Sequence, residues 1–382
     1  MKSCIATGDY FRLGETFVNR HIDKLFGGET CIVAGRWNGE NPSGRPIFVR
    51  RQRGSSVADL LVAPYWLTMN TLRHGTSRHP FGSARRDLVS FLRQNGVEVI
   101  LAEFGTQALA LAPLANEMDI PIFTYFRGTD ASKSIQSPRI VQAYRKMMPR
   151  LAGVFSVSQF LLDNLARVGV THPNAHVIPS GVNVRTVRPG DKVALKCLAV
   201  GRFVEKKAPE ITLRAFAEAA RDVAEASLTM IGDGPLLERC RALAGELGVA
   251  DKVVLPGAMP HAAVLAELAG TQVFLQHSIT AKDGNTEGLP TAIQEALACG
   301  CAVVSTRHAG IPEAVDEGET GWLVDEFDTE GYTRHIAEAL RLPAGRLAEM
   351  GLMARQVAEA RFDNDALLHK LETRILEAMG RS

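Results

Sequence analysis

The sequence has no apolar stretch long enough to cross a membrane. The uncharged run of apolar character over residues 60–72 has 13 residues and contains Pro64, whereas a spanning helix needs about 20. The apolar stretch after Met1 is also too short for a signal peptide. These absences predict a cytoplasmic protein. Tyr65 and Trp66 within 60–72 leave peripheral contact with a membrane surface open.

The chain also lacks a pattern of paired cysteines and a signature of disorder. Its six cysteines are scattered, mostly in apolar runs, without the spacing of a zinc site. We expect reduced thiols in the core and no metal centre. With 382 residues, of which 46% are hydrophobic, the chain is long enough for two domains with ordinary cores.

Net charge is nearly absent, but charge is unevenly distributed. The formal charge is +1 for the whole chain, +6 for residues 1–100 and −5 for the remainder. Residues 45–93 contain nine arginines and two acids. They form either an ordinary solvated face or a patch for anionic lipid head groups or a phosphorylated ligand. Nucleic acid is not expected as a partner, because no interleaved aromatic residues or binding module accompany the arginines.

Short β-branched runs alternate with helical patterns along the whole chain, which predicts α/β domains with parallel sheets. The rhythm breaks at a polar, Pro- and Gly-bearing stretch near 181–192. We therefore expect an N-terminal domain over 1–185, a C-terminal domain over 186–360 and a final segment over 361–382. Parallel sheets bind ligands at the carboxyl ends of their strands. The predicted strands are 31–34, 97–101, 120–125, 153–157, 193–200, 228–231, 252–255, 272–275 and 302–305.

The most specific pattern lies in residues 285–300, where Glu287 and Glu295 flank the expected start of a helix. Pro290 fits the first helical position and Gly300 the end, so we predict a helix over about 290–299. The free amides of its first turn and the positive end of its dipole attract an anion, phosphate above all. Two carboxylates beside a phosphate are suited to hold neutral hydroxyl groups on either side of it. A nucleotide sugar has this layout.

Two cations follow the strand expected over 193–200. Gly201 permits close approach to the backbone, and Arg202 and Lys207 come next. Arginine can fork onto phosphate oxygens, and lysine adds a point charge. A departing nucleoside diphosphate gains charge as its sugar bond breaks, so such cations would stabilise the transition state more than the ground state. On this motif alone, surface charges at a helix start are the simpler interpretation.

Other polar residues also follow predicted strands. Gly232 belongs to an Ile-Gly-Asp-Gly-Pro turn that suits close approach of a nucleotide, although the third glycine of a dinucleotide fingerprint is missing. His277 closes the strand over 272–275, where a lone histidine is usually structural. In the first domain, Gly14 opens a helix, and Arg127 and Asp130 follow the strand over 120–125. Each of these would line a ligand site at the edge of its sheet.

Taken together, these motifs resemble the retaining glycosyltransferases of family 4, which have the GT-B fold of two Rossmann-like domains facing across a cleft. The resemblance is close over about 155–325 and thinner before that. It rests on the Glu-x7-Glu pair, the Gly-Arg-x4-Lys stretch, Ile-Gly-Asp-Gly-Pro, Val-Ile-Pro-Ser-Gly-Val-Asn and Gly-Glu-Thr-Gly-Trp-Leu-Val. The segments before Glu287 and after the helix especially resemble enzymes of bacterial exopolysaccharide or capsule synthesis.

The resemblance implies roles for the matching residues. Arg202 and Lys207 would hold the diphosphate, Glu295 the ribose hydroxyls and Glu287 the transferred sugar. The backbone from 288 to 291 would complete the phosphate cradle. The donor-binding set is then Glu295, Gly288, Leu289, Pro290, Thr291, Gly201, Gly14, Gly232 and His277.

The resemblance also implies the course of the reaction. Members mostly need no metal and keep the anomeric configuration by a front-face route, in which the leaving phosphate helps to deprotonate the acceptor. No cofactor is expected beyond the nucleotide sugar, with UDP or GDP as its carrier. The acceptor would be a glycan or a sugar on a membrane-bound lipid diphosphate, and the final helix would cross back to the first domain. The expected location is the cytoplasm, with association to the inner face of the plasma membrane left open.

One position departs from the family pattern. Many relatives have a histidine in a Phe-His-Gly-x-Asp turn that faces the donor sugar, and this chain has Arg127 there. Arginine cannot act as a base near neutral pH. We therefore place Arg127 in the catalytic group with Glu287, Arg202 and Lys207, but expect it to pair with an anion such as a uronic acid carboxylate or an acceptor phosphate. Asp130 in the same turn is a weaker acceptor-binding prediction.

Two other functions share these features. A nucleotide-sugar epimerase of the same fold would need several acid and base side chains in the cleft, and the sequence does not supply a recognisable set. A non-catalytic nucleotide-sugar or glycan binder would be expected to have lost Glu287, Arg202 or Lys207, and all three are present. Release of nucleoside diphosphate from candidate donors distinguishes the three alternatives.

Overall fold

The computed structural model of the chain describes residues 1–11, 16–37, 39, 41–52 and 57–381. The chain clusters into an N-terminal domain, Met1–Ile178 with Leu368–Ser382, and a C-terminal domain, Pro179–Leu367. The division thus differs from the expected boundaries at 185/186 and 360/361. The reason is a backbone bridge: the Val182 amide donates to Phe362 O at 2.8 Å and the Asn364 amide donates to Val182 O at 3.0 Å. This pairing holds both segments to the C-terminal domain.

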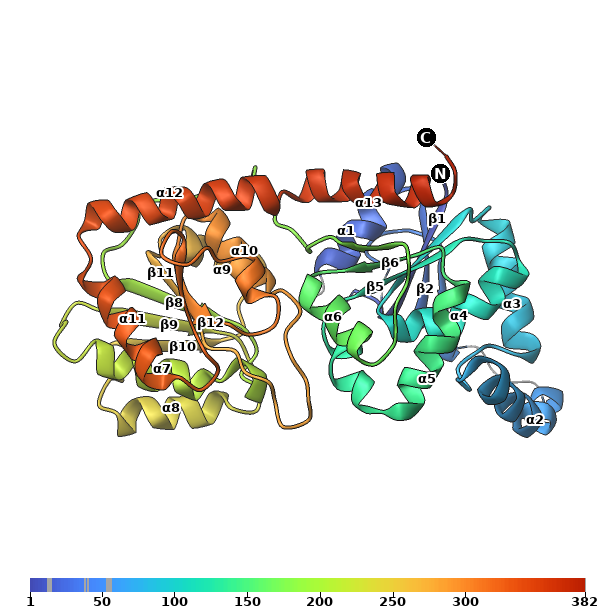
Figure 1. Cartoon of the computed structure of the whole chain (residues 1–382), viewed down its shortest axis with the longest axis horizontal. Coiled ribbons are helices and arrows are strands. Elements are labelled where there is room, and N and C mark those ends of the chain that lie inside the picture. The colour runs from blue at the N-terminus through green and yellow to red at the C-terminus, as the bar shows by residue number, and fades with distance from the viewer. Residues whose placement is uncertain (12–15, 38, 40, 53–56, 382) are drawn as a thin grey trace. The chain divides into compact units, whose positions relative to one another are not determined.

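The N-terminal domain is built on a parallel sheet of seven described strands in the order β3-β2-β1-β4-β5-β6-β7. Figure 1 shows these elements. The strands are β1 (Ser3–Asp9), β2 (Thr30–Arg36), β3 (Ile47–Val49), β4 (Val99–Glu103), β5 (Ile122–Phe126), β6 (Gly153–Ser156) and β7 (Ala175–Val177). The helices are α1 (Thr16–Lys24), α2 (Val57–His74), α3 (Gly82–Gln94), α4 (Gly105–Glu117), α5 (Pro138–Met147) and α6 (Gln159–Arg167).

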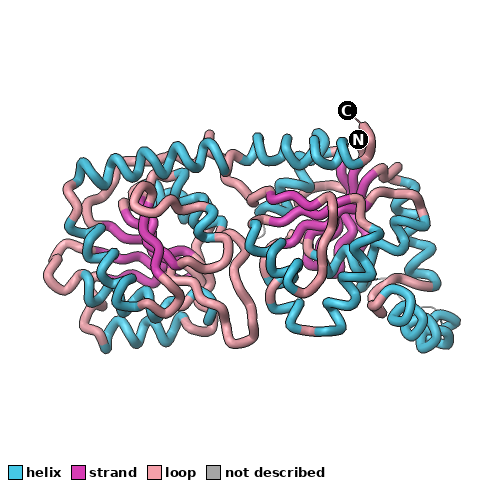
Figure 2. The backbone as a smooth tube through the Cα atoms, in the orientation of Figure 1, coloured by secondary structure: helices cyan, strands magenta, loops and turns pink. Residues whose placement is uncertain are grey.

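The C-terminal domain has a parallel sheet of six described strands in the order β10-β9-β8-β11-β12-β13. Within each domain the helices pack outside the sheet (Figure 2). The strands are β8 (Lys196–Val200), β9 (Ser227–Ile231), β10 (Val253–Gly257), β11 (Val273–Gln276), β12 (Ala302–Thr306) and β13 (Gly321–Val324). The helices are α7 (Pro209–Ala219), α8 (Leu237–Glu246), α9 (His261–Ala269), α10 (Thr291–Ala298), α11 (Thr329–Arg341), α12 (Ala344–Arg361) and α13 (Asn364–Ala378), the last of which continues into the N-terminal domain.

The predicted parallel α/β architecture is confirmed, and each predicted strand overlaps an observed one. The strands that are missing from the predicted set are β1, β3, β7 and β13. Both β3 and β7 have three residues, and β7 is only half-buried at the edge of its sheet. Such short edge strands carry little of the apolar periodicity on which a sequence prediction relies.

The two ends of α10 show how the predicted helix is realised. The helix begins at Thr291, one residue later than expected, because Pro290 has a ψ of 126° and precedes the first turn. Its expected end is confirmed, since Gly300 has a φ of +68° and takes the left-handed conformation that glycine allows. The segment thus forms a helix that begins at Thr291, directly after Pro290.

The chain end returns to the N-terminal domain through α13. In that domain Glu372 Oε1 accepts from the Phe26 amide at 2.5 Å, Lys370 donates to Val177 O at 3.3 Å, and Arg381 pairs with Glu98 at 2.9 Å. Residues 368–382 accordingly belong to the N-terminal domain.

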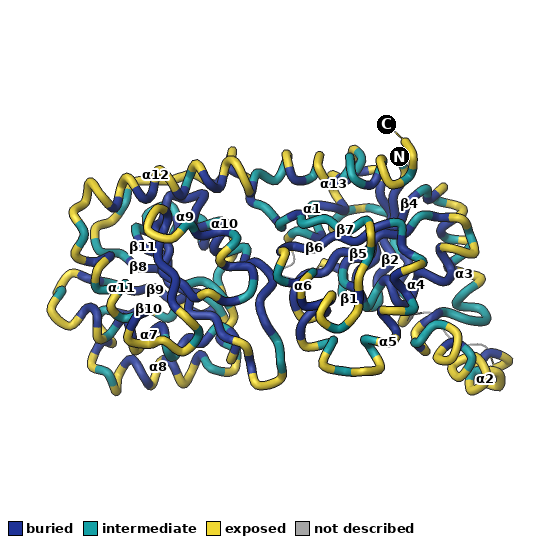
Figure 3. The backbone as a smooth tube through the Cα atoms, viewed as in Figure 1, coloured by how far each residue is buried: buried dark blue, intermediate teal, exposed yellow. Residues whose placement is uncertain are grey.

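The burial pattern leaves one helix conspicuously exposed. Most strand residues of both sheets are buried, while most of α2 is exposed along its length (Figure 3). None of the described helices combines the length and the apolar composition that crossing a bilayer requires.

Arg355 on α12 connects three parts of the C-terminal domain. Its guanidinium donates to Val187 O at 2.6 Å, to Ala298 O at 2.7 Å and to Val184 O at 2.5 Å. Ala298 ends α10, so the positive charge also lies at the negative end of that helix dipole. One side chain thereby holds the interdomain segment, α10 and α12 together.

We expect Arg355→Met to lower the free energy of unfolding by about 2–4 kcal/mol, because buried carbonyls lose a charged donor. Arg346→Met on the same helix is the control, since Arg346 is exposed and its one ion pair among the described residues is with Glu349; its expected effect is below about 1 kcal/mol. The midpoint of urea unfolding measures both. Equal midpoints for the two variants would contradict the role of Arg355.

Candidate active site

The predicted donor residues gather at the carboxyl edge of the C-terminal sheet. Gly201 and Arg202 follow β8, Gly232 follows β9 and His277 follows β11. Glu287 and the start of α10 come from the chain between β11 and β12. The edge therefore collects its polar groups from segments spread over about ninety residues of sequence, as expected for the ligand-binding edge of a parallel sheet.

Glycine is required where β8 and β9 end. Gly232 has a φ of +144°, and a Cβ atom there would lie 1.9 Å from Gly201 O. A Cβ atom on Gly201 would lie 3.3 Å from Cε of Lys207. The two glycines thus allow the strand ends to approach closely and leave room for the lysine stem beside them. Their role in this structure is steric, because a larger residue at Gly232 would collide with the backbone of Gly201.

Glu287 is the centre of a buried ion cluster. Its Oε1 lies 3.2 Å from Nζ of Lys206 and 3.5 Å from Nζ of Lys207. Lys206 also donates to Thr286 O at 3.0 Å. The turn at Glu205–Lys207 is thereby tied to the segment before α10. The structure brings Lys207 and Glu287 together, and Lys206, for which the sequence predicts no role, shares the carboxylate.

The titration of this cluster follows from its charges. Burial by itself would raise the pKa of Glu287, but the ammonium groups of Lys207 and Lys206 outweigh it and lower the pKa to about 2. Burial lowers the pKa of Lys207, and repulsion by Lys206 and Arg202 adds to this, while Glu287 opposes it. Glu287 is therefore ionised at neutral pH and cannot serve as a general acid there.

Cations outnumber the carboxylate in the group formed by Arg202, Lys206, Lys207 and Glu287. Arg202 is exposed and forms no ion pair with any residue in the described part of the chain. Together with Lys207 it lines a small cavity of about 30 Å³ at the ends of β8, β9 and β11. Three cations and one carboxylate leave a net positive charge of about two, which suits a diphosphate.

The start of α10 is held in place by neighbouring segments. The Gly310 amide donates to Gly288 O at 2.8 Å. The side chain of Gln294 makes two bonds: its Nε2 donates to Leu289 O at 3.4 Å, and its Oε1 accepts from the Gly181 amide at 2.8 Å. Gly288, Leu289 and Pro290 are buried, and Thr291 is half-buried. Of the four predicted cradle residues, Thr291 is thus the most accessible, and its amide has no preceding carbonyl within the helix.

Glu295 is occupied by a neighbour in this structure. Its Oε1 lies 2.8 Å from Nε2 of His261, the first residue of α9. The hydrogen bond to Glu295 raises the pKa of His261 although burial opposes it. The resemblance assigns ribose hydroxyls to Glu295, so His261 would be their competitor. Sequence patterns do not indicate this histidine, because its partner lies 34 positions away.

His308 supports Glu287 from the other side. The Glu287 amide donates to Nε2 of His308 at 3.0 Å, and Nδ1 of His308 lies 2.5 Å from Oε1 of Glu326. Burial lowers the pKa of His308, so a neutral ring that donates through Nδ1 and accepts through Nε2 fits both contacts. Glu326 is fixed in turn by the amide and hydroxyl of Thr280. The segment after the helix, which contains His308, contributes to the family resemblance, but the sequence does not predict a role for His308 itself.

His277 is fully buried. Its Nε2 accepts from the Phe327 amide at 3.2 Å, and its ring meets Tyr332 edge-on with 4.8 Å between centroids. Burial lowers the pKa of His277 to about 4. The ring therefore braces the Phe327 loop, and its predicted contact with the donor remains a prediction that would need this packing to open.

Arg127 in the N-terminal domain already has a carboxylate partner. Its Nε donates to Glu103 at 2.8 Å, and its guanidinium lies between the rings of Tyr125 and Phe17 at 3.8 and 3.9 Å. Glu103 also lies 2.5 Å from Nδ1 of His21. Burial would raise the pKa of Glu103, but Arg127 and His21 lower it to about 2. Pairing of Arg127 with a ligand anion remains a prediction, and Glu103 would compete with that anion.

The acceptor prediction for Asp130 meets a different arrangement. Its carboxylate accepts from the amides of Arg127 at 3.0 Å, Gly128 at 3.1 Å and Gly105 at 2.9 Å. It therefore caps its own turn and ties it to the start of α4. Gly14, predicted to approach the donor phosphate, lies outside the described residues.

Comparison with known proteins places the chain in a family. The model for glycosyl transferases group 1 matches residues 189–357, and the model for glycosyltransferase family 4 matches residues 31–186. A relative from Salmonella typhimurium, whose name WcaL assigns it to colanic acid biosynthesis, is 30% identical over 88% of this chain and 84% of its own. The amylovoran biosynthesis glycosyltransferase AmsK of Erwinia amylovora is 29% identical over 74% of this chain and 70% of its own. The chain belongs to glycosyltransferase family 4.

Solved structures agree on the fold. Anabaena HepE, determined with UDP and glucose, aligns with a TM-score of 0.78 and 15% identity over 98% of this chain and 99% of its own. This likeness confirms the expected GT-B fold of two Rossmann-like domains. The protein is therefore a glycosyltransferase by family and fold.

We expect Glu287→Gln to lower the free energy of unfolding by roughly 3 kcal/mol at pH 7, because two ammonium groups lose their counter-charge. The folded-state pKa of Glu287, about 2, lies below the ordinary value of 4.5. Its contribution is thus complete above pH 4.5 and is lost as pH falls toward 2. Urea unfolding from pH 7 to pH 2 should show the two proteins converging.

Glu319→Gln is the matched control, because Glu319 is exposed in the same domain. Its unfolding midpoint should follow the wild type at every pH. A constant gap between Glu287→Gln and the wild type down to pH 2 would show that the carboxylate is not stabilised by its charge.

Proposed function

We propose that the protein is a retaining, metal-independent glycosyltransferase that moves a sugar from a UDP or GDP donor to a glycan or lipid-linked acceptor in bacterial surface polysaccharide synthesis. The single observation that carries this proposal is the pair of Lys206 and Lys207 on ionised Glu287, with Arg202 beside Lys207 at the same cavity. The names of the relatives support the pathway, since they assign two of them to colanic acid and amylovoran synthesis.

The donor assignment has two supports. HepE of Anabaena was determined with UDP-glucose, and a Mycolicibacterium smegmatis relative, 36% identical over 44% of each chain, is named as GDP-mannose-dependent. The diphosphate would lie against Arg202 and Lys207 with the first amides of α10 beside it. Glu295 would take the ribose hydroxyls once it releases His261.

The proposed reaction is the front-face route that the family resemblance implies. The bond between C1 of the sugar and the β-phosphate oxygen breaks, and the acceptor oxygen forms a new bond to C1 on the same face. The acceptor proton passes to the departing phosphate oxygen. Arg202 and Lys207 stabilise the negative charge that develops on the diphosphate. Glu287, which is ionised, stabilises the positive charge that develops on the sugar.

Neutralising the cations should slow the transfer. We expect Arg202→Ala and Lys207→Ala each to reduce kcat by about a hundredfold or more, because each removes a charge from the developing diphosphate. Release of UDP or GDP from candidate nucleotide sugars measures the rate, and proton NMR of the product gives the anomeric configuration. EDTA should leave the wild-type rate unchanged.

Arg214→Ala is the matched control, because Arg214 is an exposed arginine on the neighbouring helix α7. Its rate should equal that of the wild type. Turnover that survives the loss of both Arg202 and Lys207 would overturn the assignment, and inverted product would overturn the retaining mechanism.

We propose that the enzyme reaches its acceptor at an anionic membrane surface through α2. An ordinary surface helix buries its apolar side chains, whereas the buried side chains of α2 are the polar Asp59 and Asn70. Asp59 accepts from the Ser83 amide at 3.2 Å, and Asn70 donates to His79 O at 3.1 Å. Its large apolar side chains are exposed instead: Val57, Leu60, Leu61, Val62, Tyr65, Trp66, Leu67 and Leu72.

A bilayer suits this surface for two reasons. Exposing so many large apolar groups is costly in water, with each worth about 1.5–3 kcal/mol when buried. The helix also lies in the arginine-rich stretch over 45–93 of a region with net charge +6. Apolar side chains beside cations are the combination that binds anionic lipid surfaces.

We expect the wild type to sediment with phosphatidylglycerol vesicles and much less with phosphatidylcholine vesicles. Leu61→Glu should lower the fraction bound about tenfold, because Leu61 is 78% exposed and would carry a charge into the lipid. Leu352→Glu on α12, where the leucine is 66% exposed, is the control and should bind as the wild type does. Equal binding by the two variants would exclude α2 as the contact surface.

A further inference from the structure

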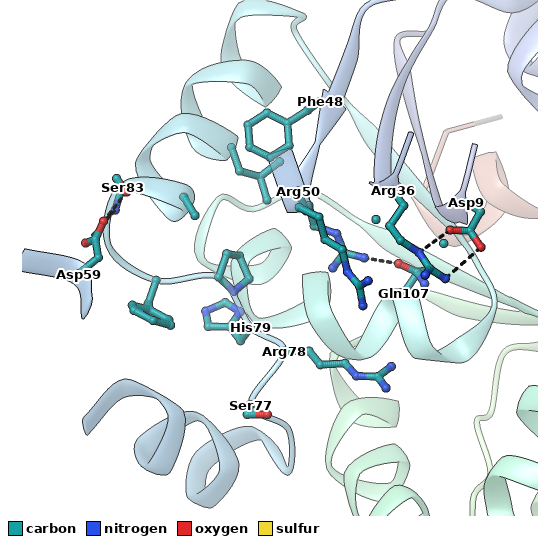
Figure 4. A pocket seen from close by; sticks show the side chains of 17 residues that line it. Asp9, Arg36, Phe48, Arg50, Asp59, Ser77, Arg78, His79, Ser83 and Gln107 are labelled. Atoms are coloured by element: carbon teal, nitrogen blue, oxygen red, sulfur yellow. Dashed lines mark hydrogen bonds and ion pairs between the residues drawn. The ribbon is translucent and has the colours of Figure 1, made fainter. Parts of the chain in front are cut away.

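The N-terminal domain contains a cavity of about 540 Å³ outside the donor site described above. It lies at the carboxyl ends of three neighbouring parallel strands, β1, β2 and β3, where Asp9, Arg36 and Arg50 are found (Figure 4). Its other wall is the segment 77–84, which runs from the loop after α2 into the first turn of α3. The position is that of a ligand site in an open α/β sheet.

Glycines keep the strand ends of this cavity bare. A Cβ atom on Gly35 would lie 2.6 Å from Gly8 O and 3.6 Å from Nη2 of Arg50. The absence of side chains there lets Arg50 lie across the ends of β1 and β2. Its Nη2 donates to Oε1 of Gln107 in the first turn of α4. The backbone thus leaves space that a ligand can enter.

The acids of the cavity are already occupied. Asp9 pairs with Arg36 at 2.8 Å, and Asp59 accepts from the amide and the hydroxyl of Ser83. In Figure 4 these two pairs lie on opposite sides of the cavity. Asp9 thus neutralises Arg36. Among the described residues, neither acid pairs with another cationic side chain that lines the space.

Three arginines that line the cavity have no counter-charge in the part of the chain that the structure describes. No carboxylate among the described residues pairs with Arg50, Arg51 or Arg78, and Nε of Arg50 is buried without a hydrogen-bond partner in the described chain. Burial lowers the pKa of Arg50 to about 10, with repulsion by Arg78 and Arg51 as further causes. A cluster of like charges beside a cavity is unfavourable until an anion enters it.

We propose that this cavity binds a phosphate-bearing group of the acceptor, with Arg50, Arg51 and Arg78 as its ligands. The inference rests on the proposed transferase function and names the acceptor class. Three guanidinium groups match the charge of a diphosphate better than that of a single carboxylate. The volume lies in the range of small-molecule sites and leaves room for a sugar beside the phosphates. Phe48, Phe81 and Leu88 supply an apolar wall for it.

The binding test uses inorganic pyrophosphate as the probe and protein saturated with UDP, so that the donor site is filled. Isothermal titration calorimetry should show one pyrophosphate per chain. Arg50→Gln and Arg78→Gln should each weaken its Kd about tenfold or more. Arg86→Gln on α3 is the control, because Arg86 is exposed and lies outside the cavity lining. Pyrophosphate that binds the Arg50 and Arg78 variants as tightly as the wild type would overturn the proposal.

Thermal unfolding separates a ligand site from a structural role. If the arginines repel one another, Arg78→Gln keeps or raises Tm in the absence of ligand. Pyrophosphate should raise Tm of the wild type but not that of the variant. A lower Tm in the variant without ligand, together with an unchanged pyrophosphate response, would mean that Arg78 serves the fold. Glucuronate is the carboxylate probe, and arginine-dependent binding of glucuronate in place of pyrophosphate would overturn the phosphate assignment.

A kinetic comparison identifies the source of the phosphate. Two acceptors carry the same sugar, one on a short prenyl diphosphate and one on a neutral alkyl chain. The diphosphate acceptor should have the higher kcat/KM by about tenfold or more, and Arg50→Gln should abolish this preference through KM. Equal use of both acceptors by the wild type would refute this inference while leaving the transferase function intact. Failure to bind UDP or to release it from any nucleotide sugar would refute the function itself.

Discussion

The C-terminal domain depends on one buried interaction, the contact of the Glu287 carboxylate with the ammonium groups of Lys206 and Lys207. A buried carboxylate is unstable alone, and two cations overcompensate it. The cluster therefore stays ionised and keeps an excess of positive charge at the sheet edge. It also ties the turn after β8 to the segment before α10, because Lys206 binds Thr286 O as well.

This interaction is supported by a chain of neutral and charged groups behind it. His308 accepts the Glu287 amide, and Glu326 holds His308 through its other ring nitrogen. The position of the carboxylate is thus set from both its backbone and its side chain. Rigid placement of this kind is what allows a group to stabilise a transition state without first reorganising.

Arginine side chains of the N-terminal domain lie in two different environments. Arg127 is buried between two aromatic rings and pairs with Glu103, so its charge is neutralised within the domain. Arg50, Arg51 and Arg78 line a cavity, and no carboxylate among the described residues pairs with them. The same residue type is thus paired with an acid in one place and lines an open space in the other.

The sequence by itself determined the alternation of strands and helices, the start and stop of the helix after Glu287, and the presence of cations after β8, because these depend on neighbours within a few positions. It did not reveal the short edge strands β3 and β7, the links of Glu287 to His308 and of Glu295 to His261, or the pairing of Arg127 with Glu103. Those contacts join residues 21 to 34 positions apart. Only tertiary folding decides which distant side chains share a buried space, and burial in turn decides which charges must be paired.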